Sequence, residues 1–363
     1  MDKAVAVLGG GNGGRCMAAD LTLRGFKVNF YEHPSFEESI REIKETGIID
    51  LVSIDVSGAA KINKVTTVME EALSDADIIN VILPSFAHDI FYEEMIPFLQ
   101  DGQTVIVWAG DFGSIQLYNL LQEKIPEKKV FVAETNTLPH GSRITPEGWI
   151  DYHVFAPKVL LSCLPATDTG KVLEKAVRMW PRLIAADNVI AAALSNPNPI
   201  CHPPGTLLNT GRIQYSEGEF YMYKEGITEA VARVIKSVYE ETLALAEALN
   251  CEVVRYEDHD FMTPSSIMGV ALQAPFDTLK VHATHVKGPQ SMDDRYITED
   301  LPYGLVPMSE LGKKLGVQTP VIDALINIGC VVCKSNYWET GRTLQKLGIA
   351  EMDKDELLKF IQG

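Results

Sequence analysis

The sequence predicts an α/β protein in which an N-terminal, doubly wound domain of the Rossmann type is followed by a mainly α-helical domain. In the first part of the chain, short apolar runs alternate with helical patterns, which indicates a largely parallel sheet with helices on both faces. From residue 188 onward, long helical periodicities dominate and strand patterns are scarce. Because 363 residues exceed one small domain, we expect two, residues 1–185 and residues 186–363.

The first domain opens with a strand, a tight turn and a helix. Residues 4–8 form an apolar run, GGGNGG follows at 9–14, and residues 15–24 have helical spacing. The sequence KVNFY at 27–31 predicts a second strand, which closes a βαβ unit of about thirty residues. Further buried strands are expected at 77–83, 104–110, 129–135 and 158–165.

Two other groups of elements complete the expected fold. Residues 48–56 (IIDLVSIDV) have strand character and predict an extra hairpin before a strand around 65–68. In the second domain, helices are expected over 226–249, 309–315 and 319–334. In the first of these helices, charges alternate around an apolar stripe, which is typical of a scaffold helix and of a dimer face.

The turn at 9–14 has the spacing of a dinucleotide-binding motif. Gly9, Gly11 and Gly14 form GxGxxG directly after a strand and at the start of a helix. The first glycine permits the tight turn, the second lets the backbone approach a pyrophosphate, and the third allows the helix to pack closely. The residues of this turn expected to bind the cofactor are Gly9, Gly11, Asn12, Gly13 and Gly14.

Glu32, at the end of the second strand, favours NAD over NADP as the cofactor. Its carboxylate can accept hydrogen bonds from both ribose hydroxyls of the adenosine, and it would repel a 2′-phosphate. The neighbouring His33 weakens this preference, so NADP is the second choice. The alternative interpretation is a glycine turn without a ligand and a Glu32 that is only a solvated surface acid.

The composition limits the classes of ligand and the compartment. A net charge of −17 repels nucleic-acid backbones and anionic membranes, so small molecules are the expected partners. Six cysteines in apolar contexts, and a start without the basic segment of a secretory signal, predict a cytoplasmic protein. Cys330 and Cys333 form a CxxC within an apolar helical pattern, which favours core packing over a metal site, and none is expected. Cys201, beside His202, is the more tempting cysteine as a nucleophile, but no other residue supports acyl transfer.

One histidine stands in a run of prolines, NPNPICHPPGT at 196–206. Proline fixes φ at about −65° and restricts the residue before it, so a stiff loop that is neither helix nor strand is expected here. A rigid backbone would hold His202 in place, as a general acid or base requires. The alternative is an inert histidine on a surface or interdomain loop.

Several stretches together resemble the octopine/nopaline-type opine dehydrogenases over nearly the whole chain. The most restrictive are the His-Pro stretch NPICHPPGTLLNTGRI at 198–213 and RYITEDLPYGLVPMSELG at 295–312. The others are LGGGNGG at 8–14, LPSFAH at 83–88, AETNTLPHGSR at 133–143, EGITEAVARV at 225–234, TPVIDALI at 319–326 and GRTL at 341–344.

The resemblance implies an NAD-dependent reductive condensation. The amino group of an amino acid adds to the ketone of a 2-oxo acid such as pyruvate, hydride reduces the imine, and an N-(carboxyalkyl) amino acid, an opine, is released. The family pairs a histidine with an aspartate, which implies that His202 and Asp300 are the catalytic residues, with Glu299 as the next candidate. A carboxylate fixes the tautomer of an imidazole and stabilises its cation.

The resemblance also places residues beside the cofactor. Pro84, Ser85 and Thr137 follow predicted strands, and we expect all three to border the nicotinamide. His88 is expected either there or against the helix that follows it.

Substrate binding is expected to need cations, since both substrates carry a carboxylate. The cationic candidates inside matching stretches are Arg143 and Arg212, and a structural ion pair is the alternative for each. Thr206 is a further candidate for substrate binding. The residues 140–142 (HGS) depart from the aromatic, small and cysteine residues common in the family, which leaves the substrate preference open.

Two other functions are open at the level of sequence. A dehydrogenase of the ketopantoate-reductase or hydroxyacid type would reduce a ketone without an amine, but the former would use a lysine, and the His-Pro stretch has none. A non-catalytic regulator that senses NADH would not need both His202 and Asp300. A homodimer is expected from base rates alone.

Overall fold

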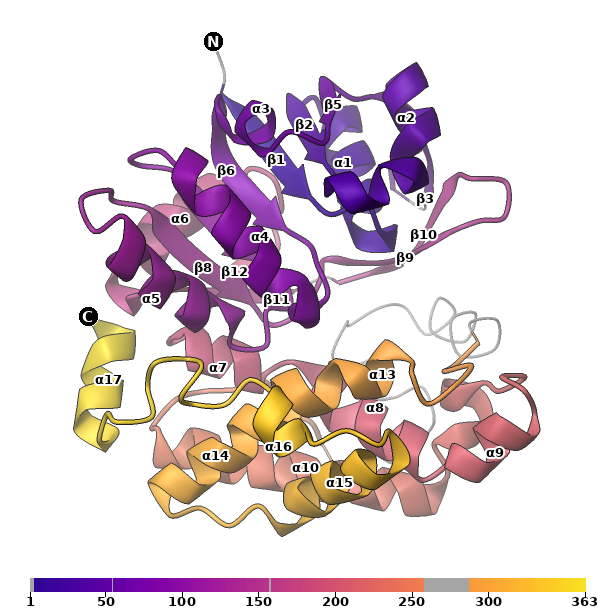
Figure 1. Cartoon of the computed structure of the whole chain (residues 1–363), viewed down its shortest axis with the longest axis vertical. Coiled ribbons are helices and arrows are strands. Elements are labelled where there is room, and N and C mark those ends of the chain that lie inside the picture. Colours follow the sequence, from indigo (N-terminus) through magenta and orange to yellow (C-terminus); the bar gives the residue numbers. More distant parts are fainter. Residues whose placement is uncertain (1–2, 54, 157, 258–286) are drawn as a thin grey trace. The chain divides into compact units, whose positions relative to one another are not determined.

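The computed structural model describes residues 3–53, 55–156, 158–257 and 287–363 (Figure 1). The chain divides into two compact units, Met1–Ala185 and Ala186–Gly363. Among the described helices, none combines the length and the hydrophobicity that a membrane span needs.

The first unit is built on an eight-stranded sheet in the order β12-β11-β8-β7-β6-β1-β2-β5. All neighbouring strands are parallel except β8 and β11, which are antiparallel. Its strands are β1 (Ala4–Leu8), β2 (Val28–Tyr31), β5 (Lys64–Thr66), β6 (Ala76–Val81), β7 (Thr104–Val107), β8 (Phe131–Thr135), β11 (Val159–Leu164) and β12 (Leu183–Ala185). The predicted α/β class is confirmed, and the strand expected at 158–165 joins this sheet.

Helices cover the sheet because its strands are apolar on both faces. They are α1 (Asn12–Leu23), η1 (Pro34–Ile40), α2 (Arg41–Thr46), α3 (Met69–Leu73), η2 (Ser85–Ala87), α4 (His88–Met95), η3 (Ile96–Phe98), α5 (Gly113–Lys124), η4 (Ala166–Asp168) and α6 (Thr169–Ala176). On one face, side chains such as Leu8, Val81 and Val107 pack against Phe91 and Leu117 of α4 and α5. This core fixes the strand ends from which the loops of the site emerge.

A second, four-stranded sheet has the order β4-β3-β10-β9. Its strands are β3 (Ile48–Ser53), β4 (Gly58–Lys61), β9 (His140–Ile144) and β10 (Ile150–Phe155). The predicted hairpin is confirmed as the antiparallel pair β3 and β4, whereas β9 and β10 were not predicted. Helix α1 packs between the two sheets, since it contacts β1 and β2 on one side and all four strands of the smaller sheet on the other.

Every regular element described in the second unit is a helix (Figure 1), as predicted. They are α7 (Val189–Leu194), α8 (Pro197–Leu207), α9 (Thr210–Tyr215), η5 (Met222–Gly226), α10 (Glu229–Ala248), α13 (Arg295–Thr298), η7 (Asp300–Leu305), α14 (Val306–Leu315), α15 (Pro320–Val332), α16 (Tyr337–Thr340) and α17 (Lys354–Gln362). The elements η5 and η7 are π-helices. Helix α8 contacts α10, α13, α15 and both π-helices.

The prediction of a stiff loop at 196–206 is wrong, because Pro197–Leu207 form helix α8. The first two prolines stand in the first turn, where backbone N–H groups have no helical partner, so they leave the helix intact. Asn196 caps this end by accepting a hydrogen bond from the N–H of Asn198 at 3.0 Å. The two later prolines remove internal hydrogen bonds, but every residue of α8 except Asn198 is buried, and that burial stabilises the helix.

Candidate active site

The glycine-rich turn joins β1 to α1 in the first unit. Gly9 has a φ of +115°, in the region that favours glycine. A Cβ on Gly14 would lie 1.7 Å from the Gly9 carbonyl oxygen, whereas a Cβ on Gly11 would meet nothing within 4 Å. No described side chain caps α1 at Gly11, so the first N–H groups of the helix point to an anion site. This open backbone fits the pyrophosphate of a dinucleotide.

The other predicted residues of the turn pack beside it. Asn12 is held by β9, since its carbonyl oxygen accepts a hydrogen bond from Ser142 Oγ at 3.1 Å and its Oδ1 accepts one from Ile144 N at 2.7 Å. A Cβ on Gly13 would lie 2.9 Å from Ile82 and 3.1 Å from Leu138, so glycine is required for the loops after β6 and β8 to reach α1.

Glu32 lies at the end of β2 with only 8% of its surface exposed. Its Oε2 accepts a hydrogen bond from Gly10 N at 2.7 Å, and its Oε1 accepts one from His33 N at 2.7 Å. The carboxylate is therefore fixed against the glycine turn, where the adenosine ribose lies in domains of this type. The His33 ring pairs with Glu94 at 2.9 Å, so the histidine next to Glu32 already has a carboxylate partner.

Pro84, Ser85 and Thr137 follow strands β6 and β8 at the carboxyl edge of the sheet, as predicted. A Cβ on Gly9 would come within 2.3 Å of the Ile82 carbonyl oxygen, so the loop after β6 runs directly against the turn. Ser85 donates a hydrogen bond to Asp111 Oδ2 at 3.4 Å, and the Thr137 carbonyl accepts one from Thr135 Oγ1 at 3.0 Å.

His88 and His140 are both buried in the first unit. His88 begins α4 and stacks on Tyr92 with ring centroids 5.2 Å apart, which is the helix-facing position of the two predicted. His140 begins β9 and packs edge-on against Tyr152 and Trp180. Burial lowers the pKa of His140 to about 4, so its ring is neutral at pH 7.

The catalytic pair implied by the sequence comes together in the second unit. His202, on α8, and Asp300, at the start of η7, are 98 residues apart in sequence, yet Nδ1 of the imidazole lies 2.8 Å from Asp300 Oδ2. Both side chains are almost fully buried. An ionised carboxylate accepts the hydrogen bond from Nδ1–H, so Nε2 is the nitrogen left to exchange a proton.

Two tyrosines that sequence reasoning missed complete the surroundings of His202. Tyr223 Oη lies 2.8 Å from His202 Nε2. The ring of Tyr296 stacks on the imidazole, with centroids 3.7 Å apart and planes 3° apart, which fixes the plane of the imidazole. Tyr296 stands inside the matching stretch at 295–312, so its position was a usable signal. Tyr223 stands outside every matching stretch and gave no signal.

The charges around Asp300 come from neighbouring residues of the same segment. Burial, followed by the nearby Glu299 carboxylate, raises the pKa of Asp300 well above its usual value, while Arg295 lowers it. Arg295 Nη1 lies 3.5 Å from Glu299 Oε2, and half of the arginine side chain is exposed. Sequence reasoning did not select Arg295, although it opens the same matching stretch as Asp300.

The remaining predicted residues have contacts of their own. Thr206 is fully buried one turn after His202, and its hydroxyl contacts Met222 Sδ at 3.9 Å. Arg212 forms an exposed ion pair with Glu225 at 3.1 Å, which is the structural alternative. Arg143 lies on β9, in register with Asp151 of β10.

The cysteines show no sign of chemistry among the described residues. All six are free thiols, and no group of three or more potential metal ligands is found there. Burial raises the pKa of Cys201 to about 12, which keeps the thiol protonated and argues against a nucleophile. Cys330 and Cys333 are half-buried at the end of α15.

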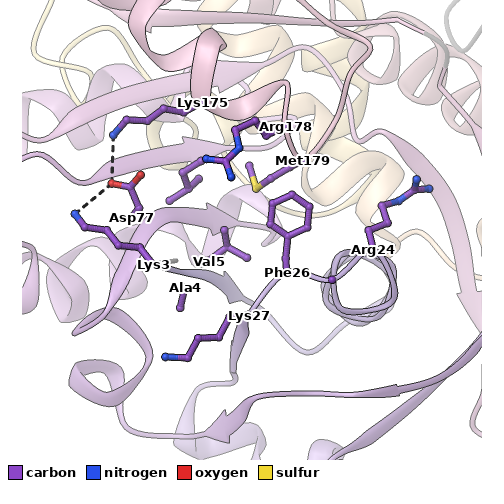
Figure 2. A pocket seen from close by; sticks show the side chains of 12 residues that line it. Lys3, Ala4, Val5, Arg24, Phe26, Lys27, Asp77, Lys175, Arg178 and Met179 are labelled. Carbon is purple, nitrogen blue, oxygen red and sulfur yellow. Dashed lines mark hydrogen bonds and ion pairs between the residues drawn. The ribbon is translucent and has the colours of Figure 1, made fainter. Parts of the chain in front are cut away.

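A basic pocket of about 490 Å³ lies at the opposite edge of the main sheet, beside the amino ends of β1, β2 and β6 (Figure 2). Its cationic lining residues are Lys3, Arg24, Lys27, Lys175 and Arg178. Asp77 pairs with Lys175 at 3.2 Å and with Lys3 at 3.6 Å. Since the glycine turn follows the carboxyl end of β1, this pocket is not the dinucleotide site.

Comparisons with known proteins agree with this geometry. The family model for the α-helical domain of NAD/NADP octopine/nopaline dehydrogenases matches residues 185–333. The opine dehydrogenase of Arthrobacter sp. (strain 1C) is 30% identical over 354 residues, which cover 96% of each chain. Solved structures of octopine dehydrogenase with NADH and either L-arginine or pyruvate match with a TM-score of 0.72 at 18% identity, over 98% of each chain. A ketopantoate reductase from Ralstonia eutropha JMP134 matches with a TM-score of 0.60 at 17% identity, over 91% of this chain and 98% of its own.

Proposed function

Because the chain belongs to the octopine/nopaline dehydrogenase family of NAD-dependent oxidoreductases, we propose that it condenses an amino acid with a 2-oxo acid such as pyruvate and reduces the product to an opine. The reverse oxidation uses the same groups. The proposal rests mainly on the buried His202–Asp300 pair, because the condensation and its reversal both need a group that gives and takes a proton near neutral pH.

The first unit supplies the cofactor site. Residues of the turn between Gly9 and Gly14 would hold the pyrophosphate, and Glu32 would accept hydrogen bonds from the adenosine ribose, which favours NAD over NADP. Pro84, Ser85 and Thr137 would border the nicotinamide from the strand ends. When bound, NADH supplies the hydride that reduces the imine carbon.

The second unit supplies the proton chemistry and a cation for the substrate. His202 is the general acid and base, and Asp300 fixes its tautomer through Nδ1. We assign the binding of a substrate carboxylate to Arg295 in preference to Arg143 and Arg212, since its charge acts directly on the catalytic Asp300.

The first experiment follows NADH absorbance with the purified protein and a panel of amino acids and 2-oxo acids, each alone and then in pairs. We expect oxidation only when both are present. Oxidation with an oxo acid alone would assign the chain to the hydroxyacid type, and no oxidation with any pair would contradict the proposal and favour an NADH-binding regulator.

Variants then test the catalytic pair. His202→Ala and Asp300→Asn are each expected to lower kcat by roughly 10²- to 10⁴-fold while NADH still binds. Asp293→Asn makes the same chemical change at an exposed acid of the same segment and should keep the activity of the wild type. Near-normal turnover of His202→Ala would remove the assigned role. A cytoplasmic location and a homodimer are part of the same proposal, and gel filtration tests the second.

A further inference from the structure

We propose that Tyr223 passes the proton between His202 and the substrate, as the outer member of a Tyr223–His202–Asp300 relay. This inference rests on the proposed function and assigns the place where the proton leaves the protein. Its basis is that both imidazole nitrogens are engaged: Nδ1 lies 2.8 Å from Asp300 Oδ2, and Nε2 lies 2.8 Å from Tyr223 Oη.

The direction of the relay follows from the chemistry of imidazole. The nitrogen that faces the carboxylate keeps its proton in both charge states, so only Nε2 gains and loses one. In the neutral ring Nε2 accepts the hydrogen bond of Tyr223 O–H, and in the cation Nε2–H donates to Tyr223 Oη. A proton that arrives at or leaves Nε2 along the existing hydrogen bond therefore passes through the tyrosine oxygen.

Tyr223 is held too firmly to swing out of the way of a substrate. Only 3% of its surface is exposed, and its backbone is part of η5, where the N–H of Ile227 bonds to the carbonyl of Met222 five residues earlier. Asn209 ties η5 to α8, because its Nδ2 donates to the carbonyl oxygens of both Gly205 and Gly226, at 2.8 and 2.9 Å.

Burial also keeps the tyrosine in the protonation state that a relay needs. It raises the pKa of the Tyr223 hydroxyl well above its usual value, and the nearby Tyr296 side chain adds to this rise. A hydroxyl that stays protonated can give its own proton on one side while it receives another on the opposite side, so the phenolate is never a stable state.

The step assigned to the relay is the loss of water from the carbinolamine that forms when the amine has added to the ketone. The C–O bond breaks, the leaving hydroxyl takes the proton of Tyr223 O–H, and the nitrogen lone pair forms the C=N bond. Tyr223 takes the proton of His202 Nε2–H, and the imidazolium becomes neutral. One proton is consumed, and one water and one iminium cation are formed, so atoms and charge balance; no oxidation state changes in this step.

The test compares Tyr223→Phe with the control Tyr221→Phe. Tyr221 lies two residues earlier, is less buried than Tyr223 and is not part of the relay, so the control removes the same hydroxyl group from a neighbouring tyrosine. We expect Tyr223→Phe to lower kcat for the paired substrates by roughly 10²- to 10⁴-fold. The KM for NADH and the thermal midpoint should stay close to the wild type, and Tyr221→Phe should keep the wild-type kcat. A loss of kcat equal in the two variants, or a fall in thermal midpoint that accounts for the loss, would overturn the relay.

A double variant separates a relay from an independent structural role. Groups that act in one proton path are not additive, so His202→Ala/Tyr223→Phe should be no slower than His202→Ala alone. Losses that multiply would show that Tyr223 acts independently of His202 and would overturn the inference while the proposed function stands. A wild-type protein that oxidises NADH with no substrate pair would overturn both.

Discussion

The buried ring of His140 predicts that the first unit loses stability in mild acid. Because burial lowers the pKa of His140 from 6.5 to about 4, the folded state resists protonation that the unfolded chain accepts. The contribution of this group is fully present above about pH 6.5 and is lost as the pH falls towards 4. Linkage between these two pKa values gives a loss of about 1–2 kcal/mol between about pH 8 and pH 5.5, and on the order of 3 kcal/mol below pH 4.

The assay is urea unfolding of the wild type and of His140→Phe at about pH 8 and pH 5.5, followed by tryptophan fluorescence. Both pH values lie above the sequence pI of about 4.9, which is the pH at which aggregation is greatest. Trp180 packs on the His140 ring and lies near Trp108, so fluorescence reports on this core directly. Phenylalanine keeps the aromatic packing and removes the titration, so the variant should lose about 1–2 kcal/mol less than the wild type over this interval. Equal losses in the two proteins would refute the reasoning.

Three further predictions concern the cofactor turn and the relay. Gly14→Ala places a Cβ 1.7 Å from the Gly9 carbonyl oxygen, so it should abolish NADH binding in a fluorescence titration and lower the thermal midpoint. The control is Gly11→Ala, whose Cβ meets nothing within 4 Å and which should keep the thermal midpoint of the wild type. Glu32→Ser removes the carboxylate that would repel a 2′-phosphate and should raise the ratio of kcat/KM for NADPH to that for NADH by about tenfold, equivalent to about 1.4 kcal/mol; an unchanged ratio would contradict the role of Glu32. Asn209→Ala removes the hydrogen bonds that tie η5 to α8 and should lower kcat with little change in the KM for NADH. If Asn209 acts only by placing Tyr223, adding Asn209→Ala to Tyr223→Phe should not lower kcat further. A further loss of kcat in the double variant would show that Asn209 acts by another route.

The sequence predicted the first unit well where local signals agree with the fold. The sequence predicts the strand, turn and helix over β1 and α1, the positions of the buried strands along the chain, and the hairpin of β3 and β4. The strands β9 and β10 were missed because their segments carry no clear alternation, and pairing with each other and with β3 decides their conformation.

The expectation for the proline run failed for a related reason. Taken one at a time, the prolines disfavour a helix, but the first two occupy positions where a helix tolerates them. The burial of nearly the whole of α8 then outweighs the hydrogen bonds that the later prolines remove. His202 is therefore held in place by a packed helix instead of by the stiff loop that the prolines predict.

The two partners of His202 show what the sequence alone could not give. Asp300 was selected through a family resemblance, whereas Tyr223 was not selected at all, and both stand on π-helices, η7 and η5. A π-turn holds one more residue than an α-turn, which rotates the side chains that follow and leaves a carbonyl for an outside partner. In η7 the carbonyl of Pro302 accepts the N–H of Arg342 at 2.7 Å, and in η5 the carbonyl of Gly226 accepts from Asn209. Because such turns have no periodic signature in a sequence, the side chains that they aim at α8 emerge only when the chain has folded.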